Sequence, residues 1–413
     1  MNRMSEYEYF VSVERAVDIA SNYPPRLNIE NVKITNCLNR VITKNIPSLV
    51  TDPPFDNSSM DGYAVIHSDT IDASLEQPIF LKIVGVSQAG INPLSKLESG
   101  QAVKIMTGAR IPPGADSIVL VEEAELINDD TEFGKVKLFS KSRINYIRIA
   151  GENMKKNQIM LQAGEKIDPY KIGLIATMGY SELPVYSKLK VSIISTGDEL
   201  VKPGTDLKTG QIYESNSYFL AALIEELGHE PIIIDLVNDN LDELREKMNE
   251  ASNNSDMIIT SGGVSMGEFD LVRKIMEEEG DIKFWRIKMK PGSPPLFGLW
   301  NNTPLFGLPG NPISSQLVFL MIVKPWLCKI FGTKSNPHQI VKAKLTKNLK
   351  KVSDVLLLRR VLVENTPEGM TAKPALNQGS GNSSSTAISN AVTLIQPGQS
   401  ADMGDIIDVL FIR

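Results

Sequence analysis

Hydrophobic and polar positions between residues 188 and 335 repeat in two alternating patterns. Short, continuously apolar runs are typical of buried strands. Between them lie longer stretches in which apolar residues recur every three or four positions, as in amphipathic helices. The predicted strands cover residues 190–194, 231–237 and 256–260, and the predicted helices cover residues 217–227, 241–250 and 271–276. This alternation predicts a doubly wound, mainly parallel α/β sheet.

The segments on either side of this unit contain mostly short β-like runs with Gly and Pro between them. One helix is also predicted, over residues 168–179, with Asp168 before it, Pro169 at its first position and Gly179 after its end. We therefore expect a multidomain α/β plus β protein with four parts. They are a discontinuous N-terminal linker or dimerisation domain, an inserted small β domain, the central α/β domain and a C-terminal β-barrel-like domain, with expected bounds of 1–54 with 141–187, 55–140, 188–335 and 336–413.

The composition of the 413-residue chain narrows its possible functions. A net charge of −6 argues against non-specific nucleic-acid binding as the main role. Two cysteines and three histidines, which share no motif, make a disulfide framework, a zinc enzyme and a Ser-His-Asp hydrolase poor candidates. The first residues contain no apolar signal region, and the apolar run 317–323 is too short to span a membrane. We therefore expect a cytoplasmic protein.

A glycine-rich loop between a strand and a helix carries the clearest chemical signal. Residues 260–270 read Thr-Ser-Gly-Gly-Val-Ser-Met-Gly-Glu-Phe-Asp and follow the apolar run 257–259. Glycines let backbone N–H groups approach a phosphate, and the positive end of the following helix faces it. The loop also ends in the carboxylates Glu268 and Asp270, which repel a bare phosphate. A hard metal ion between protein and ligand would reconcile the two features.

Seven motifs in a fixed order make the chain resemble a known family. The motifs are Asp56-Asn57-Ser58-Ser59-Met60-Asp61-Gly62-Tyr63-Ala64, Met106-Thr107-Gly108-Ala109, Gly151-Glu152-Asn153, Ser195-Thr196-Gly197-Asp198-Glu199-Leu200, Ser261-Gly262-Gly263-Val264-Ser265, Lys290-Pro291-Gly292 and Gly307-Leu308-Pro309-Gly310-Asn311-Pro312. Over almost its whole length the chain resembles the molybdopterin molybdotransferases, and it is similar to the C-terminal domain of gephyrin. The resemblance implies that the α/β domain is of the molybdopterin-binding type.

The reaction that the resemblance implies inserts molybdate into adenylylated molybdopterin, releases AMP and uses Mg²⁺. Both substrates are anionic, so catalysis needs positioning and charge neutralisation more than a protein nucleophile. Mg²⁺ prefers oxygen ligands and keeps several waters, so a few carboxylates suffice. The resemblance also implies a homodimer with a composite active site and a molybdopterin adenylyltransferase as the upstream supplier. Neither a nucleic acid nor a membrane is expected as a partner.

Six residues are assigned to catalysis by the resemblance. They are Asp61, Thr107, Glu199, Asp239, Asp270 and Lys290, of which Glu199, Asp239 and Asp270 are the expected metal ligands. Plainer interpretations compete with these roles, because acidic residues such as Glu199 and Asp270 also cap backbone N–H groups beside helices. Asp61 before Gly62 would by itself indicate a turn. Since Asp61 and Thr107 lie outside the α/β unit, the resemblance implies that they face the cleft of the dimer partner.

A second set of residues is expected to hold the pterin and its phosphate or molybdate. It comprises Gly262, Gly263, Ser265, Arg286, Pro309, Pro312, Arg148 and Ser384, with Ser385 beside the last. Arg286 stands where the family commonly has Lys, and the two residues bind anions differently. Asn153 stands where Asp is common, which removes a charge. If residues 285–290 form a strand, Arg286 and Lys290 share one face, either as anion ligands or as a solvated basic face. Glu268 is interpreted as a surface carboxylate.

Two other functions are compatible with parts of this pattern. A non-catalytic scaffold on the same fold, as in gephyrin, would not need the acidic set together with Lys290. Adenylylation of molybdopterin by the related small α/β proteins predicts a stand-alone α/β domain, and the long flanking segments argue against it. The transferase is therefore the favoured interpretation.

Overall fold

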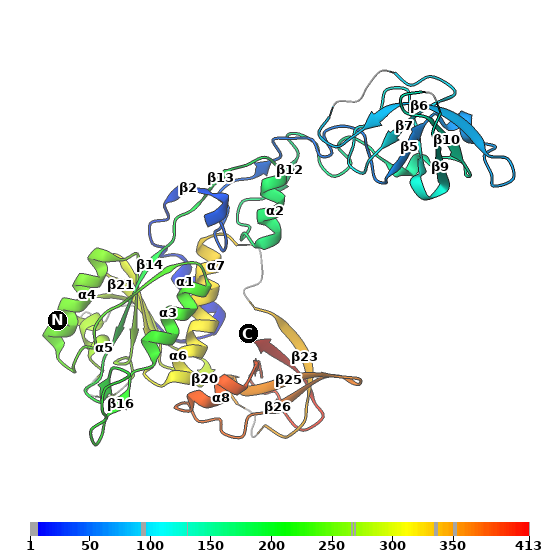
Figure 1. Cartoon of the computed structure of the whole chain (residues 1–413). Helices are drawn as coiled ribbons and strands as arrows, with labels where there is room; N and C mark the ends of the chain where they lie inside the picture. The colour runs from blue at the N-terminus through cyan, green and yellow to red at the C-terminus, as the bar shows by residue number, and fades with distance from the viewer. Residues whose placement is uncertain are drawn as a thin grey trace. The chain divides into compact units, whose positions relative to one another are not determined.

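The computed structural model describes residues 7–91, 96–129, 131–265, 267, 270–333, 338–349 and 353–412. The chain divides into two structural units. The first unit comprises residues 1–44, 163–170 and 182–413, and the second comprises residues 45–162 and 171–181. Figure 1 shows the elements of each unit.

A seven-stranded sheet forms the centre of the first unit (Figure 1). In spatial order its strands are β1 (Glu8–Val11), β19 (Asp281–Ile287), β21 (Leu296–Trp300), β22 (Thr303–Leu308), β18 (Met257–Ser261), β14 (Lys190–Ser195) and β17 (Glu230–Ile233). Within this sheet only β21 runs antiparallel to its neighbours. The mainly parallel α/β fold predicted from the sequence is therefore confirmed.

Helices cover both faces of this sheet, as a doubly wound fold requires. They are α1 (Val13–Ser21), α3 (Asn216–Glu226), α4 (Leu241–Asn254), α5 (Leu271–Glu278), α6 (Pro312–Val318), the π-helical η5 (Phe319–Val323) and α7 (Lys324–Ile330). Side chains alternate across a strand, so Ile259 packs with α1, α3, α6 and α7, whereas Ile258 packs with α4 and α5. These two hydrophobic clusters form the core of the unit.

Local sequence signals explain where several of these helices begin. The Asn240 Oδ1 accepts hydrogen bonds from the N–H groups of Asp242 and Glu243, at 2.9 and 3.1 Å, so α4 begins after an Asn cap. Pro312 occupies the first position of α6, where its missing N–H costs nothing. The helical stretch Pro312–Ile330 is long and apolar enough to cross a membrane, but 61% of it is buried inside this unit, which identifies it as a core helix.

The start of the chain belongs to the α/β sheet, and this corrects the expected placement of residues 8–21 in a linker domain. β1 pairs with β19 in parallel, with Glu8 opposite Phe284. α1 packs in the same hydrophobic cluster, where the Trp326 indole N–H donates to the Ala20 carbonyl at 3.0 Å. Residues 8–11 carry no periodic pattern of their own, so nothing local identified them as a sheet strand.

A closed barrel forms the C-terminal part of the first unit. Its strands in spatial order are β23 (Ile340–Leu345), β26 (Gly369–Pro374), β25 (Arg360–Thr366), β27 (Ala391–Thr393) and β28 (Ile406–Phe411). The barrel has its own apolar core and carries the short helix α8 (Ser383–Ile388). The pair of β20 (Met289–Lys290) with β24 (Leu356–Leu357) joins it to the α/β part.

The second unit is built around a six-stranded sheet. Its strands in spatial order are β8 (Ser117–Leu120), β5 (Gly62–Val65), β7 (Gln101–Ile105), β6 (Ile79–Ser87), β10 (Lys135–Leu138) and β9 (Ala124–Ile127). Alternation along β6 places Leu81 and Ile83 in the core while Phe80 is 54% exposed. The β-like runs predicted from the sequence, at 79–86, 102–106, 117–121 and 135–139, correspond to β6, β7, β8 and β10, whereas β5 and β9 were not predicted.

Shorter elements connect the larger ones. In the first unit they are the pair of β2 (Ile29–Lys33) with β13 (Glu182–Tyr186) and the pair of β15 (Leu200–Val201) with β16 (Ile212–Tyr213). In the second unit β3 (Ile46–Pro47) pairs with β12 (Ile159–Leu161), and β4 (Asn57–Ser58) pairs with β11 (Ile147–Arg148). Helix α2 (Pro169–Thr177) begins at the proline that the sequence predicts.

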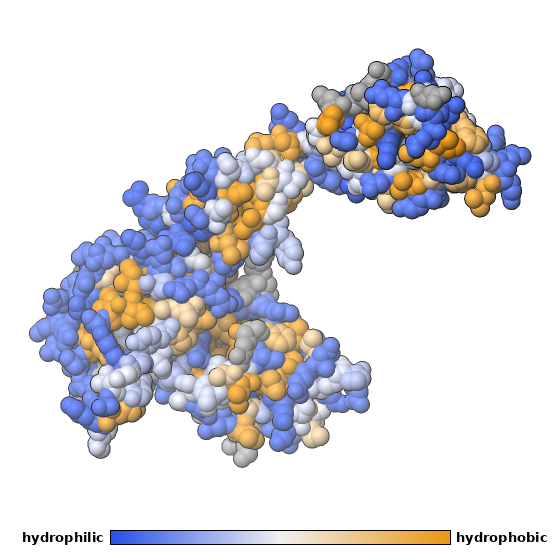
Figure 2. Space-filling view, viewed as in Figure 1, coloured by the Kyte–Doolittle hydropathy of each residue, from blue (hydrophilic) through white to orange (hydrophobic). Residues whose placement is uncertain are grey.

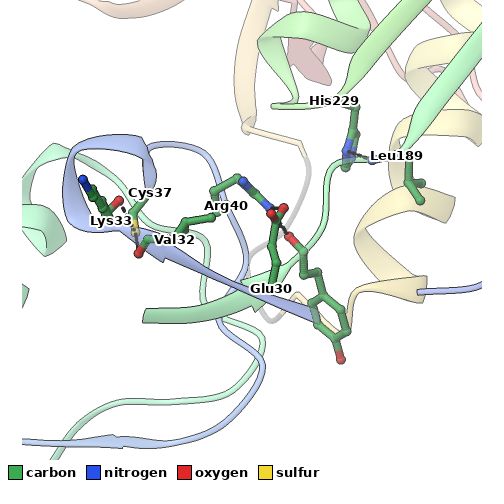
Figure 3. A network of polar contacts seen from close by, with 8 residues as sticks. Glu30, Val32, Lys33, Cys37, Arg40, Leu189 and His229 are labelled. Atoms are coloured by element: carbon green, nitrogen blue, oxygen red, sulfur yellow. Dashed lines mark hydrogen bonds and ion pairs between the residues drawn. The ribbon is translucent and has the colours of Figure 1, made fainter. Parts of the chain in front are cut away.

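A polar network lies between the β2–β13 pair and the sheet (Figure 3). The Arg40 guanidinium forms an ion pair with Glu30, and its Nε–H donates to the Tyr186 carbonyl at 3.2 Å. The His229 ring stacks on Phe331 at 5.2 Å, and its Nδ1 accepts the N–H of Leu189 at 3.3 Å. Burial, and to a smaller extent the positive charges of Lys166, Arg40 and Lys188, lower the pKa of His229 to about 4. The ring is therefore neutral at pH 7.

Candidate functional site

Four loops that follow parallel strands of the seven-stranded sheet line one cleft. Parallel strands end at a common edge, so loops far apart in sequence meet there. The cleft has a volume of about 640 Å³. Its walls include Thr196, Gly197 and Glu199 after β14, Asp239 after β17, Ser261, Gly262, Gly263 and Asp270 after β18, and Gly310, Asn311 and Pro312 after β22. Gly381, just before α8, and Ser383, its first residue, complete the wall from the C-terminal part of the chain.

The two glycines of the predicted anion cradle have backbone conformations that other residues rarely adopt. Gly262 has a φ of 103° and Gly263 a φ of 68°. A Cβ on Gly263 would lie 3.0 Å from the Val272 Cγ2, and one on Gly262 would lie 3.1 Å from the Thr196 carbonyl oxygen. The loop can therefore lie close to α5 and to the β14 loop only with glycine at both positions.

Asn216, at the start of α3, ties two of these loops together. Its side-chain N–H₂ donates to the Ser261 hydroxyl at 2.7 Å and to the Gly310 carbonyl at 2.8 Å. The side chain is buried, and its Oδ1 has no hydrogen-bond partner among the described residues. Asn216 lines the cleft and holds the glycine loop against the loop after β22.

Glu214 is a second cleft residue that sequence reasoning missed. It is 3% exposed, and its carboxylate accepts hydrogen bonds from the Ser195 hydroxyl at 3.1 Å and the Ser217 N–H at 2.8 Å. These contacts fix the start of α3 to the end of β14. The sequence signal was a run of polar residues, Glu214 to Asn216, before an apolar helix, which by itself indicates only a helix cap.

The carboxylates of the cleft influence one another. Asp239 has a raised pKa, first because it is partly buried and then because Asp198, Glu199 and Asp270 place negative charge around it. The N–H of Asp239 donates to the Asp198 carboxylate at 2.9 Å, which holds the two loops together. The predicted acidic residues Glu199, Asp239 and Asp270 therefore share one cleft with the glycine loop.

The three carboxylates do not form a ready metal cage. Among the residues that the structure describes, no group of three or more His, Cys, Asp or Glu side chains is arranged to hold a metal ion. Asp270 instead accepts a hydrogen bond from the N–H of Gly267 in its own loop. Glu268, predicted to be a surface carboxylate, lies outside the described residues.

Asp61 and Thr107 meet in the second unit. The Asp61 carboxylate accepts hydrogen bonds from the Thr107 N–H at 2.6 Å and from its hydroxyl at 2.9 Å. These two bonds lower the pKa of Asp61, so the carboxylate is ionised at neutral pH. Both residues are exposed, and they form a preorganised pair on the surface of their unit.

Arg286 and Lys290 do not line the cleft of the described chain. The Arg286 guanidinium donates to the Tyr9 hydroxyl at 3.0 Å and lies over the Tyr9 and Phe10 rings, at 5.9 and 5.8 Å. Arg286 also has a φ of 67°, and β19 ends at Ile287, so the predicted continuous strand over 285–290 is wrong. Lys290 is exposed in the separate short strand β20.

The remaining predicted residues divide between the two units. Pro312 lines the cleft, whereas Pro309 is buried, and Ser265 is exposed outside the wall. The Ser384 hydroxyl donates to the Asn382 side chain at 2.6 Å, and Ser383, one position earlier, lines the cleft instead. In the second unit, Arg148 is exposed in β11, and the Asn153 side chain donates to the Asp52 carboxylate at 2.8 Å.

Family comparisons agree with this architecture along most of the chain. Residues 11–179 match the MoeA N-terminal region (domain I and II), and residues 192–329 match a probable molybdopterin binding domain. A molybdopterin molybdenumtransferase of Haemophilus influenzae is 39% identical over 327 residues, covering 78% of each chain. One from Bacillus subtilis is 33% identical over 409 residues, covering 98% of this chain and 94% of that one.

A solved structure has the same fold. The crystal structure of the molybdopterin biosynthesis moeA protein from Pyrococcus horikoshii OT3 aligns with a TM-score of 0.82 at 28% identity. The alignment covers 97% of this chain and 100% of that one.

Proposed function

The chain belongs to the molybdopterin molybdenumtransferases, enzymes of molybdenum cofactor biosynthesis, and we propose that it inserts molybdate into adenylylated molybdopterin with release of AMP. The observation that carries this proposal is the meeting of the glycine loop and three carboxylates in one cleft. Glycine N–H groups bind phosphate oxygens, and the carboxylates recruit the cation that neutralises them. An upstream molybdopterin adenylyltransferase would supply the substrate, and the cytoplasm is the expected compartment.

The oxygen ligands of the cleft suit Mg²⁺, which substrate phosphates help to bind, better than a metal ion that only protein side chains coordinate. Glu199, Asp239 and Asp270 offer only oxygen ligands. The pKa of Asp239 is raised first by its burial and then by repulsion from Asp198, Glu199 and Asp270. A divalent cation would relieve that repulsion. Mg²⁺ keeps several waters and is commonly bound by one or two carboxylates plus substrate phosphates, so a preformed cage is not required. When bound, the ion would supply charge neutralisation at the pyrophosphate-like linkage.

The Asp61–Thr107 pair is proposed to complete the cleft of a second copy of the chain. Both side chains are exposed, and the Asp61 carboxylate is ionised and held in place by two hydrogen bonds from Thr107. A carboxylate fixed in this way on the surface can contact a ligand that is bound to another copy of the chain. The first unit by itself has carboxylates and glycines in its cleft but neither Asp61 nor Thr107. A symmetric homodimer would supply each cleft with one such pair.

Chelation of divalent metal is expected to abolish AMP release without unfolding the protein. The assay measures AMP released from adenylylated molybdopterin, with molybdate and without it, before and after EDTA treatment. Mg²⁺ should restore release, because the ion is held largely by the ligand phosphates. Far-UV circular dichroism serves as the control for folding. Release that persists in EDTA would contradict the metal proposal, and release that ignores molybdate would contradict the transferase proposal.

Replacing Arg286 separates anion binding from a structural role at β1. If Arg286 contacts molybdate or phosphate in the bound state, Arg286→Ala removes a charge-assisted contact of roughly 1.5–3 kcal/mol, or about ten- to hundred-fold in molybdate use. Arg286→Lys should keep much of the activity, because the charge remains. The measurement is the molybdate dependence of AMP release, with Lys288→Ala as the matched control, since Lys288 also lies near Phe10. Lower stability with unchanged molybdate dependence would assign Arg286 to holding Tyr9 and Phe10.

A further inference from the structure

A second pocket lies in the first unit, lined by the helices α3, α6 and η5 and by the C-terminal barrel. Its volume is about 210 Å³, and Leu223, Leu317, Leu320 and Val392 provide apolar walls. Figure 2 shows apolar surface on the α/β part and on the barrel of this unit. At roughly 30 Å³ per water the pocket has room for about seven waters, which is enough for a small organic ligand.

One wall of this pocket carries a deeply buried positive charge. Arg360 is 2% exposed and lines the pocket. Its Nη2 donates to the carbonyls of Asn377 and Gly379, at 3.1 and 3.0 Å, and its Nε–H has no hydrogen-bond partner among the described residues. Burial lowers the pKa of Arg360, and the neighbouring Arg359 lowers it further. The guanidinium is thus held by neutral carbonyls, although a buried charge is stabilised best by an opposite charge.

The charges that line the pocket leave an excess of one positive charge. Arg360 and Lys324 are basic, and Glu226 is the acidic residue among the lining side chains. Glu226 is exposed, and the hydrogen bonds described for Arg360 end on carbonyl oxygens. An apolar cavity with one buried guanidinium matches a ligand that has an apolar body and a single carboxylate.

We propose that this pocket binds a small amphipathic carboxylate, with its apolar tail among the leucines and its carboxylate on Arg360. A carboxylate can accept the Arg360 Nε–H together with one Nη2–H, which would give up its bond to a backbone carbonyl, and the low dielectric of the pocket strengthens these bonds. The proposal concerns a site separate from the cleft and does not depend on the reaction proposed there.

The pocket shares two helices with the cleft, so a ligand bound there would contact elements that also form the cleft wall. In α6, Pro312 lines the cleft and Ile313 lines the pocket, while the Ile313 N–H donates to the Ser380 carbonyl at 3.0 Å. In α8, Ser383 lines the cleft, and Thr386, one turn later, lines the pocket. The Arg360 guanidinium also donates to the carbonyl of Gly379, in the loop that leads into α8. A carboxylate that recruits Arg360 changes the support of the cleft wall at residues 379–383.

Calorimetric titration of the full-length protein with octanoate tests the proposal. Octanoate should bind with a stoichiometry of one per chain. Acetate, which lacks the tail, and octylammonium, which has the wrong charge, should bind at least about tenfold more weakly. Arg360→Gln should lower octanoate affinity about ten- to hundred-fold, the range for loss of a charge-assisted hydrogen bond. Arg359→Gln is the matched control and should leave the affinity unchanged, because Arg359 does not line the pocket.

A cavity-filling variant keeps the test valid if Arg360→Gln fails to fold. Leu320→Trp occupies the pocket and leaves Arg360 in place, so octanoate binding should be lost while circular dichroism is unchanged. Absence of octanoate binding to the wild-type protein would overturn the proposal. Equal binding to Leu320→Trp, or equal binding of octylammonium, would overturn it as well. Calorimetry needs no turnover, so a failure of the transferase assay leaves this result unaffected.

Discussion

Mixing Asp61→Ala protein with Glu199→Ala protein is expected to restore about a quarter of the wild-type activity, although each variant alone is nearly inactive. Each single change removes one charged group from a composite cleft, and we expect a loss of roughly 10²–10³-fold, as for other preorganised electrostatic contacts. If subunits exchange freely, half of the dimers are mixed, and one of the two clefts in each mixed dimer contains both carboxylates. The measurement is the rate of AMP release with molybdate after subunit exchange.

Two controls make this experiment decisive. Subunit exchange has to be demonstrated independently, for example by native mass spectrometry of differently labelled subunits. A protein with both changes in one chain, mixed with an equal amount of wild-type protein, should give only about half the activity that dilution of the wild type predicts, because neither cleft of a mixed dimer then contains both carboxylates. If activity does not return while mixed dimers are present, then Asp61 does not act in the cleft of a partner.

Acidification from pH 7 to pH 4 is expected to destabilise the first unit by roughly 3 kcal/mol through His229 alone. The pKa of the ring is about 4 in the folded protein and 6.5 in the unfolded chain. Between these values the unfolded chain binds more protons, so stability falls as the pH falls, by about 1.4 kcal/mol for each pH unit of difference. Protonation also places a charge beside Lys166, Arg40 and Lys188, whose repulsion is part of the lowered pKa.

Urea unfolding followed by tryptophan fluorescence can isolate this effect. The three tryptophans of the chain, Trp285, Trp300 and Trp326, all belong to the first unit. His229→Asn keeps a hydrogen-bond acceptor for Leu189 and should remove most of the acid sensitivity. His67→Asn, in the second unit, serves as the control and should leave the tryptophan signal unchanged. Equal loss of stability in His229→Asn and wild type would show that other groups cause the acid sensitivity.

Regular patterns in the sequence predicted the α/β elements well, because they are local. The helical spacing over residues 217–227 corresponds to α3, and the apolar run before the glycine loop corresponds to β18. The strand predicted over 231–237 is shorter in the structure, since β17 ends at Ile233. β1 could not be predicted in this way, because its pairing with β19 depends on residues almost 280 positions away.

The cleft was only partly predictable from the sequence, for a similar reason. The pattern of strand, glycines and helix identified the loop of Gly262, and the family resemblance identified Glu199 and Asp239. Asn216 contributes through bonds to two distant loops, and such bonds leave no local pattern. Arg286 was assigned to anion binding by the family resemblance, whereas its positive φ turns the chain there and its side chain contacts Tyr9. Contacts between residues far apart in the sequence therefore determine where Asn216 and Arg286 lie, and hydrophobic periodicity does not reveal such contacts.

The pairing of β1 with β19 also has a consequence during synthesis on the ribosome. Glu8 pairs with Phe284, so the first strand has no neighbour in the sheet until 276 further residues have been translated. At roughly 5–20 residues per second this wait is about 14–55 s. Throughout that interval the apolar face of α1, including Ile19 and Ala20, lacks the helix α7 against which it packs. The nascent segment of β1 and α1 is therefore one on which chaperones that bind exposed apolar sequence are expected to act.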